Sequence, residues 1–371
     1  MLFRDIIGHD KIKHHLVETY QSGRTAHAQI FVGNEGSGSL ALALAYAQYL
    51  QCENPSAVDA CGTCAACHKM NKLIHPDVHF VYPTIGTGKV STDYIKEWRE
   101  ILLQNPYPSL SQWLLKMNAE NQQGNINKNE CVEIVRKFSL RQVEGRNKIL
   151  ILWLPEYLGK EGNRLLKLIE EPEPNTVFLL IAENAEKILN TILSRCQLVQ
   201  IPRLSDNDLI QYLIHKQEIP SAKATTVAYL AEGNINKALQ LAETMDNTNA
   251  QRWCEWLALC QENNGSKWVS WVDSTLNAAE KWGRKEQTLF LQYGLHFLRE
   301  LLAFKVHKDP AKLRVTEHEQ PFIQKFLYLK FGHIQQIMQH VDNAMFFIER
   351  NAAPKPLFLN MSIEINRIIK Q

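Results

Sequence analysis

The chain has 371 residues, 45% of them hydrophobic, with 41 Lys and Arg against 39 Asp and Glu and a net charge of +2 at pH 7. This length predicts two or three domains, and the near-neutral balance gives no general sign of nucleic-acid binding, although a local basic patch can exist within such a total. Apolar runs stay well short of a membrane span and the N-terminus is unlike a secretory signal, so we expect a cytoplasmic protein without a membrane segment.

A glycine-rich turn stands between a short apolar strand at 29–32 and an Ala- and Leu-rich helix at 40–50. Strand, turn and helix N-terminus are the context of a phosphate-binding P-loop. Five positions define the loop: Gly33, Gly36, Gly38, Ser39 and Leu40. Ser39 stands where the motif has its phosphate-binding lysine, and Leu40 where it has a Mg²⁺-binding Ser or Thr, so we expect no productively bound nucleotide. On spacing alone, a plain strand-to-helix turn is the alternative.

The helix leads into a cluster of four of the chain's eight cysteines, Cys52, Cys61, Cys64 and Cys67. Four thiolates complete a tetrahedral zinc shell and leave no open position for water, so the pattern predicts a structural zinc rather than a catalytic one. Such a metal would hold together a small insert that lacks its own core. The other cysteines are scattered, which favours a metal site over a disulfide framework. The alternative is a set of unmetallated thiols.

The run 148–153 is apolar after its first residue, which predicts a central parallel strand buried on both faces. A P-loop ATPase ends this strand with an Asp that helps to hold Mg²⁺ and a Glu that orients the attacking water. Trp153 and Leu154 occupy those places, and Glu156 lies too far along to replace them. The preceding segment, 104–130, is polar and rich in Asn and Gln, and is interpreted as a surface insertion.

Several motifs of this region occur together in one protein family. They are His27-Ala28, the four-cysteine insert, Leu165-Leu166-Lys167, Glu170-Glu171-Pro172 and Ser194-Arg195-Cys196. In these motifs the chain resembles bacterial clamp-loader subunits of the AAA+ class, well over residues 3–202 and loosely beyond. The resemblance implies an α/β AAA+ P-loop domain, a parallel sheet with helices on both faces, followed by a small helical lid and an all-α collar.

After residue 202 the sequence is typical of helices throughout. The expected domains are the AAA+ P-loop-like domain with its zinc insert (about 52–67) at 1–204, the lid at 205–246 and the oligomerisation collar at 247–371. By the resemblance, Asn236 stands where active members carry a phosphate-sensing arginine. This is a third position at which the residue for ATP chemistry is missing.

The resemblance also implies a function. With degenerate ATP motifs, the chain resembles the stationary, non-hydrolysing member of the clamp-loader ring, and we expect no enzymatic activity from the isolated chain. In the family the Ser-Arg-Cys arginine reaches the ATP of a neighbouring motor, so Arg195 is expected to act as an arginine finger in trans, with Ser194 and Cys196 positioning its loop. The implied partners are the gamma/tau ATPase subunits and the delta subunit, with the sliding clamp and primed DNA in the DNA polymerase III holoenzyme.

Two other functions compete with this interpretation. The first is an ATP-hydrolysing gamma/tau-like motor with divergent motifs; a lysine at position 39 or acids at 153–154 would have favoured it, and the sequence has neither. The second is a zinc-bearing nucleic-acid module with a chance P-loop. A basic stripe or interleaved aromatic residues near the cysteines would favour it, and the sequence does not show either clearly.

Overall fold

The computed structural model describes residues 1–86, 88–119, 122–244, 249–262, 264–276, 282–309, 313–315 and 320–370. The chain divides into two compact units, Met1–Leu209 with Gly233–Lys237, and Ile210–Glu232 with Ala238–Gln371. The finer division into P-loop domain, lid and collar stays a prediction. Within the described residues, none of the helices combines the length and apolar character that a membrane crossing requires.

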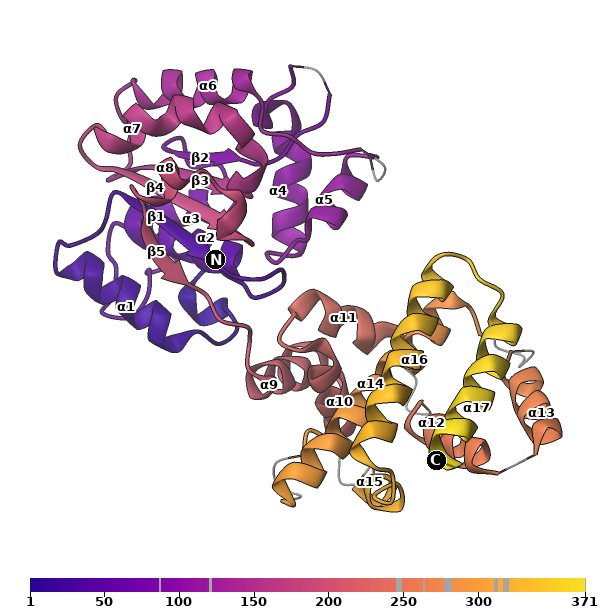
Figure 1. Cartoon of the computed structure of the whole chain (residues 1–371). Coiled ribbons are helices and arrows are strands. Elements are labelled where there is room, and N and C mark those ends of the chain that lie inside the picture. Colours follow the sequence, from indigo (N-terminus) through magenta and orange to yellow (C-terminus); the bar gives the residue numbers. More distant parts are fainter. Residues whose placement is uncertain are drawn as a thin grey trace. The chain divides into compact units, whose positions relative to one another are not determined.

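The first unit is built on a five-stranded parallel sheet with the order β2-β3-β4-β1-β5 (Figure 1). Its strands are β1 (Ala28–Val32), β2 (Val78–Val81), β3 (Lys148–Trp153), β4 (Thr176–Ala182) and β5 (Gln197–Gln200). Strands β1, β3 and β4 are buried along their whole length, whereas β5 is an edge strand that is mostly exposed. The predicted central strand and the predicted α/β class are confirmed.

Helices cover both faces of this sheet because successive strand residues point to opposite sides. Ile30 packs in one core with Ile134 and Phe138 of α6 (Lys128–Phe138). The next residue, Phe31, faces the other way and its ring centroid lies 6.5 Å from that of Tyr46 in α2 (Ser39–Gln51). Every residue of α2 is buried, so the helix that follows the P-loop is a central part of the core.

The remaining helices of the first unit surround these elements. They are α1 (Asp10–Gln21), α3 (Ala65–Asn71), α4 (Ile95–Gln104), α5 (Leu110–Lys116), α7 (Leu166–Glu170), α8 (Asn190–Leu193) and the 3-10 helices η1 (Phe3–Asp5), η2 (Ser91–Tyr94), η3 (Pro155–Leu165) and η4 (Ala185–Lys187). Helix α9 (Asp206–Gln217) begins in this unit and continues into the second.

The interpretation of 104–130 as a surface insertion is wrong in its described part. Trp113 of α5 is fully buried, and its indole N–H donates a 2.8 Å hydrogen bond to the Pro83 carbonyl. The Trp113 ring packs against Trp98 and Tyr82 at centroid distances of 5.1 and 5.0 Å. The average composition of the segment is polar, but a few large apolar residues are enough to fix it to the core.

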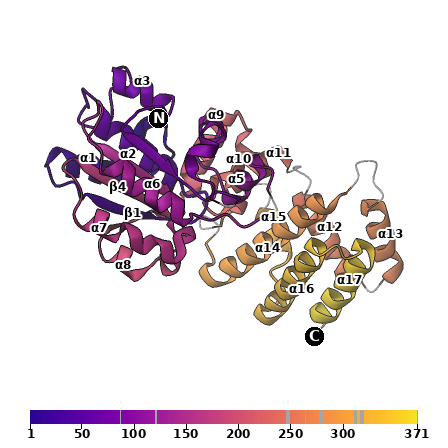
Figure 2. The same cartoon turned by 90° about the horizontal axis from the view of Figure 1, so that it is seen from above.

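The second unit is helical. Its further elements are α10 (Ser221–Ala231), α12 (Asn249–Gln261), α13 (Gly265–Leu276), α14 (Arg284–His307), α15 (Gln320–Lys325), α16 (Phe331–Glu349) and α17 (Pro354–Lys370). Helix α11 (Ile235–Thr244) begins in the first unit and continues into the second. Helices α14, α16 and α17 lie side by side in both views (Figures 1 and 2). Its core contains a group of packed aromatic rings around Trp256, Phe290 and Phe358.

Candidate functional site

The P-loop-like turn keeps the backbone form of a phosphate-binding loop. Gly36 and Gly38 have φ angles of +71° and +95°, a left-handed region in which a side chain would be strained, and Gly38 leads directly into α2. Ser39 is buried and its Oγ lies 2.9 Å from Ser37 Oγ, so these two hydroxyls are paired with each other. Leu40 is buried as well. The glycines thus build the turn. The side chains of Ser39 and Leu40, at the positions where a P-loop binds phosphate and Mg²⁺, face inward.

Side chains from distant segments fill the space over this loop. A Cβ atom on Gly36 would lie 2.0 Å from Asn234 Oδ1, which places the Asn234 side chain directly against the loop. The Ile235 N–H donates to the Gly36 carbonyl at 3.1 Å. The Tyr107 ring would lie 3.3 Å from a Cβ on Gly38. The loop is therefore in contact with the protein's own residues at both of these glycines.

Three further hydrogen bonds support this closed arrangement. The His9 Nε2–H donates to the Ser37 carbonyl at 2.7 Å, and burial lowers the pKa of this histidine. The Asn236 amide donates to the Tyr107 carbonyl and accepts a 3.0 Å hydrogen bond from Asn105. The cavity that is left beside the loop measures about 30 Å³. Ligand sites usually measure roughly 300–1,000 Å³, so the remaining space fits about one water molecule rather than a nucleotide.

The end of β3 carries apolar side chains in place of acids. Trp153 and Leu154 are 3% and 1% exposed, and the Trp153 ring lies 5.2 Å from that of Trp98. Glu156 accepts hydrogen bonds of 2.6 and 2.8 Å from the N–H groups of Glu183 and Asn184, in the turn after β4. Its carboxylate therefore anchors this neighbouring turn.

A larger cavity of about 580 Å³ opens at the carboxyl ends of β3 and β4. Its polar lining residues include Gln123, Asn125, Glu156, Glu183 and Lys187. Enclosure of the carboxylate, with the charges of Glu35 and Glu156, raises the pKa of Glu183 to about 7. Sequence analysis missed this cavity because its walls come from separate loops that carry no recognisable motif.

Arg195 lies just after α8, and its guanidinium is held by the first unit's own residues. Nε donates to Glu170 Oε1 at 2.7 Å, and Nη2 donates to the same oxygen. Nη1 donates to the Thr191 carbonyl at 2.7 Å and to Ser194 Oγ at 3.2 Å. The arginine side chain is 31% exposed, so it can be approached from solvent. Of its two predicted positioning neighbours, Ser194 touches it.

Cys196, the other predicted neighbour, packs against the core of the sheet. Burial raises the pKa of Cys196 to about 11, so its thiol stays protonated near neutrality. This partly buried side chain anchors the segment after α8 through apolar packing.

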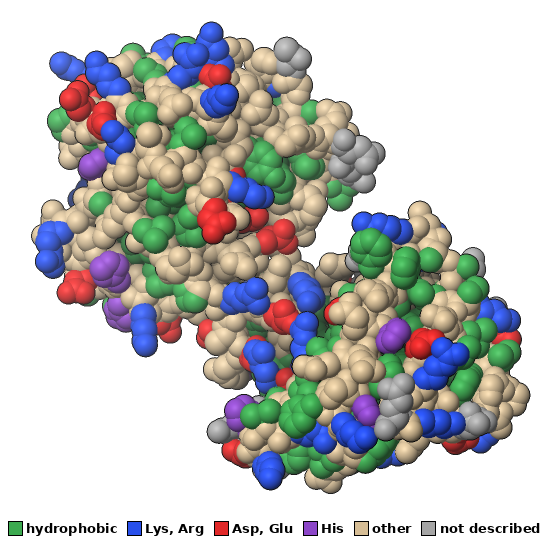
Figure 3. Space-filling model, in the orientation of Figure 1, with side chains coloured by type: hydrophobic (Ala, Val, Ile, Leu, Met, Phe, Trp, Pro, Cys, Tyr) green, Lys and Arg blue, Asp and Glu red, His purple; other side chains and the backbone are tan. Residues whose placement is uncertain are grey.

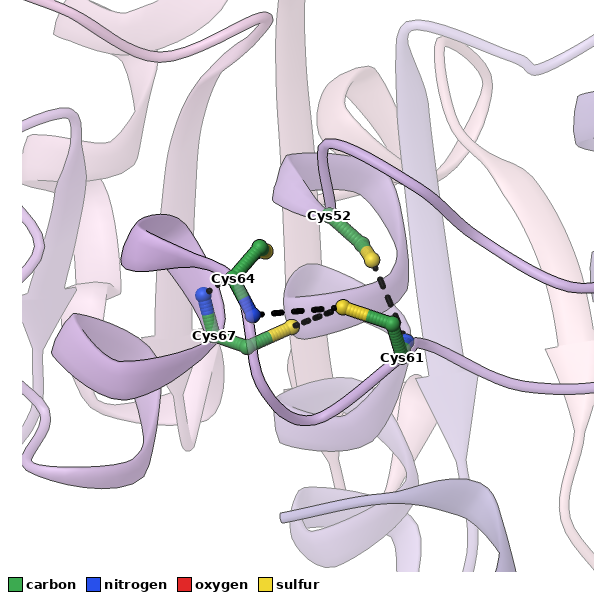
Figure 4. Close-up of side chains that lie close together, drawn as sticks. All are labelled: Cys52, Cys61, Cys64 and Cys67. Carbon is green, nitrogen blue, oxygen red and sulfur yellow. Dashed lines mark hydrogen bonds between the residues drawn. The ribbon is translucent and has the colours of Figure 1, made fainter.

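The four predicted metal ligands come together at the end of α2, in the segment that follows it and in α3 (Figure 4). All four sulfur atoms lie within 4.8 Å of one another, and Cys61 Sγ is 3.9 Å from Cys67 Sγ. None of the four forms a disulfide. A tetrahedral zinc with Zn–S bonds of about 2.3 Å holds its sulfurs about 3.8 Å apart, which fits this spacing.

The surroundings of the sulfurs also suit a metal. The N–H groups of Cys61, Cys64 and Cys67 donate to the sulfurs of Cys52, Cys61 and Cys64 at 3.2, 3.3 and 3.4 Å. Backbone N–H groups of Thr63 and Cys64 lower the pKa of Cys61 to about 6, whereas burial raises the pKa values of Cys52 and Cys67. A bound cation would offset the cost of burying those two thiolates. The cluster can therefore hold a metal ion.

Comparison with known proteins gives these sites a context. A family model described as DNA polymerase III, delta subunit matches residues 8–205. The chain belongs to this family. The protein is also similar to the DNA polymerase III subunit delta' of Haemophilus influenzae, 26% identical over 234 residues, which are 63% of this chain and 59% of that relative. The delta' subunit of Escherichia coli is 24% identical over 310 residues, 82% of this chain and 77% of that relative.

These relatives confirm the resemblance to a clamp-loader subunit of the delta-prime type. A gamma subunit, from Buchnera aphidicola, is similar too, 26% identical over 247 residues that cover 65% of this chain and 58% of that relative. The chain thus spans about three fifths of the Haemophilus and Buchnera relatives that it matches.

Proposed function

We propose that this chain is a non-hydrolysing, delta-prime-type subunit of a DNA polymerase III clamp loader. The observation that carries the proposal is the closed P-loop: about 30 Å³ remains beside it, between Tyr107 and the loop glycines. Without a lysine at position 39 or an acid at the end of β3, a nucleotide would also lack its main charged partners. The fold of an ATPase is kept while the means to bind and cleave ATP are absent.

In the proposed function, Arg195 acts on the ATP of another subunit, which explains why the fold is kept. In the proposed role its guanidinium contacts the ATP of a neighbouring gamma/tau motor and stabilises the charge that develops during phosphoryl transfer. Its partial exposure supports the proposal, because a finger in trans must reach beyond its own chain. Ser194 and Cys196 would set the direction of its segment, one by a hydrogen bond and one by packing.

The cysteine cluster is proposed to hold one structural zinc ion. Its four sulfurs would fill the coordination shell, so the metal would supply stability and no reaction step. Asp59, inside the insert, accepts hydrogen bonds of 2.9 and 3.1 Å from the N–H groups of Phe3 and Arg4. The zinc would therefore also fix the N-terminal segment of the chain.

The proposed partners are the gamma/tau ATPase subunits and the delta subunit, with the sliding clamp and primed DNA in the assembled complex of the cytoplasm. The second unit exposes apolar side chains on its surface (Figure 3). Phe331, Phe346 and Phe347 of α16 are 50%, 49% and 48% exposed. Exposed aromatic residues are typical of subunit contacts, which supports a collar that assembles with neighbours.

An ATP-hydrolysing motor is the second candidate, and the similarity to a gamma subunit favours it. It would require the P-loop to open and Glu156 to leave the turn after β4. If purified chain hydrolysed ATP, and Glu156→Gln abolished that turnover, the motor function would replace the proposed one.

The arginine finger is tested in a complex reconstituted from this chain and its partner subunits. We expect Arg195→Ala to leave assembly intact and to lower DNA-stimulated ATP hydrolysis, by about 10³-fold or more at the site that it completes. The matched control is Arg164→Ala, since Arg164 is another exposed arginine in an ion pair, with Glu161. Failed assembly with normal turnover per assembled ring would make Arg195 structural instead.

Metal analysis tests the zinc proposal. We expect one zinc per chain, lost in Cys61→Ser together with a lower melting temperature, because the insert would lose its only cross-link among the described residues. Cys131→Ser is the control, a buried cysteine outside the cluster that should keep the metal. Native protein purified without chelators that contains no zinc would refute the site.

A further inference from the structure

The Arg195 guanidinium has little hydrogen-bonding capacity left for a partner. An arginine side chain has five N–H donors. Glu170 Oε1 accepts from Nε and from Nη2, and the Thr191 carbonyl and Ser194 Oγ both accept from Nη1. Four bonds therefore hold the side chain against its own chain. A phosphate group that is to be bound through several donors must displace some of them.

Among these acceptors, Glu170 is the charged one. It is the last residue of α7, which brings its carboxylate to the segment after α8 although the two residues are 25 positions apart. A carboxylate on the guanidinium neutralises the positive charge that would stabilise a phosphate. While the pair exists, Arg195 is a weaker phosphate ligand than a free arginine.

The ion pair can nevertheless be exchanged at low cost. The Arg195 and Glu170 side chains are 31% and 45% exposed. Ion pairs at such positions are weak, because water competes for both partners and salt screens them. A phosphate carries more charge than a carboxylate and suits the planar guanidinium equally well. It can therefore replace Glu170 when it comes within reach.

We propose that Glu170 is an internal counter-ligand of Arg195, which competes with the phosphate of a neighbouring subunit's ATP for the guanidinium. This inference rests on the proposed finger role of Arg195. Glu170 keeps the arginine folded back when no phosphate is present, and the phosphate releases it. The contact thus sets how readily the neighbouring site engages ATP, and it does so without touching the nucleotide.

Glu170→Gln tests the competition in the reconstituted complex, because it removes the charge and keeps the shape. The part of the ATP hydrolysis that depends on Arg195 is the difference between the rates of the wild-type and R195A complexes at each ATP concentration. For that part we expect the apparent KM for ATP to fall by about two- to fivefold, the size of an exposed ion pair, with kcat undiminished. The difference in KM should shrink as the salt concentration rises.

Glu171→Gln is the matched control. Glu171 is also exposed and adjacent, and it has no ion pair among the described residues, so its substitution should leave KM unchanged. In the R195A background, Glu170→Gln should have no effect, because the two changes act on one interaction.

Other results would overturn the inference. A fall in kcat with unchanged KM would mean that Glu170 holds Arg195 in the position from which it acts. If both KM and kcat were unchanged, the ion pair would have no effect on ATP hydrolysis. Both results leave the finger role standing if R195A lowers ATP hydrolysis. If R195A has no effect at all, the proposed function fails and this inference fails with it.

Discussion

Single residues support the proposed absence of ATP hydrolysis. Trp153 occupies the place of a metal-binding acid, and it is buried against Trp98. An aspartate at this position would leave a cavity and bury a charge without a partner, and both changes are destabilising. Leu40 is equally buried in the place of the Mg²⁺-binding hydroxyl. Because both residues are part of the core, we expect that a single substitution would not give this site ATP hydrolysis.

A partly buried histidine gives a prediction at the same scale. Burial, and then the charges of Lys137 and Lys148, lower the pKa of His79 in β2 to about 4. In the unfolded chain a histidine titrates at about 6.5. Between these values only the unfolded state binds the proton, so the free energy of unfolding rises with pH through this window and falls on acidification.

We expect His79→Gln to remove this part of the pH dependence, of order 2 kcal/mol between pH 4.5 and 7.5. Urea unfolding of both proteins at the two pH values measures it. His14→Gln, at an exposed position in α1, is the control and should keep the slope. An unchanged slope in His79→Gln would show that His79 does not carry this dependence.

At the scale of elements, the packing of α12 against α14 depends on a glycine at the point of contact. A Cβ atom on Gly294, in the middle of α14, would lie 2.2 Å from the ring of Trp253 in α12. The glycine lets the indole lie directly on the helix backbone. This contact extends the aromatic core formed with Phe290, whose ring centroid is 5.4 Å from that of Trp253.

We therefore expect Gly294→Ala to lower the stability of the protein, whereas a Gly-to-Ala change inside a helix usually raises it. Alanine in a helix interior normally stabilises by up to about 1 kcal/mol, but here the added methyl group must displace Trp253, at a cost of about 1–3 kcal/mol. Denaturant unfolding should show the loss, and tryptophan fluorescence a changed environment. The control is Gly332→Ala in α16, where the space is open and stability should not fall. Equal stability of both variants would contradict the proposed contact.

At the scale of the whole molecule, the two units carry different parts of the proposed function. The first unit contains the closed loop, Arg195 and the cysteine cluster, while the second carries the exposed aromatic residues of α16. Helix α10 belongs to the second unit, where the Tyr229 ring stacks near His296 of α14 at 6.1 Å.

A closed P-loop predicts that ATP does not stabilise the chain. A ligand that binds only the folded state at about 100 times its Kd adds about 2.7 kcal/mol, which raises the melting temperature by several degrees. We expect no such rise in roughly millimolar Mg-ATP, measured by calorimetry on the isolated chain. A motor subunit with an intact P-loop, measured alongside, should show the rise. A similar rise for this chain would mean that the loop opens and binds nucleotide.

Local pattern in the sequence was enough to find the buried strand at 148–153 and the cysteine cluster. It also showed that positions 39–40 and 153–154 do not carry the residues that a P-loop ATPase has there. Each of these features depends on residues that are near one another in the chain. Sequence alone did not reveal the burial of Trp113 or the closing of the P-loop by Tyr107 and Asn234. Nor did it reveal the bond of Glu170 to Arg195. These contacts join distant segments, and which side chains meet there is decided by how the helices pack on the sheet.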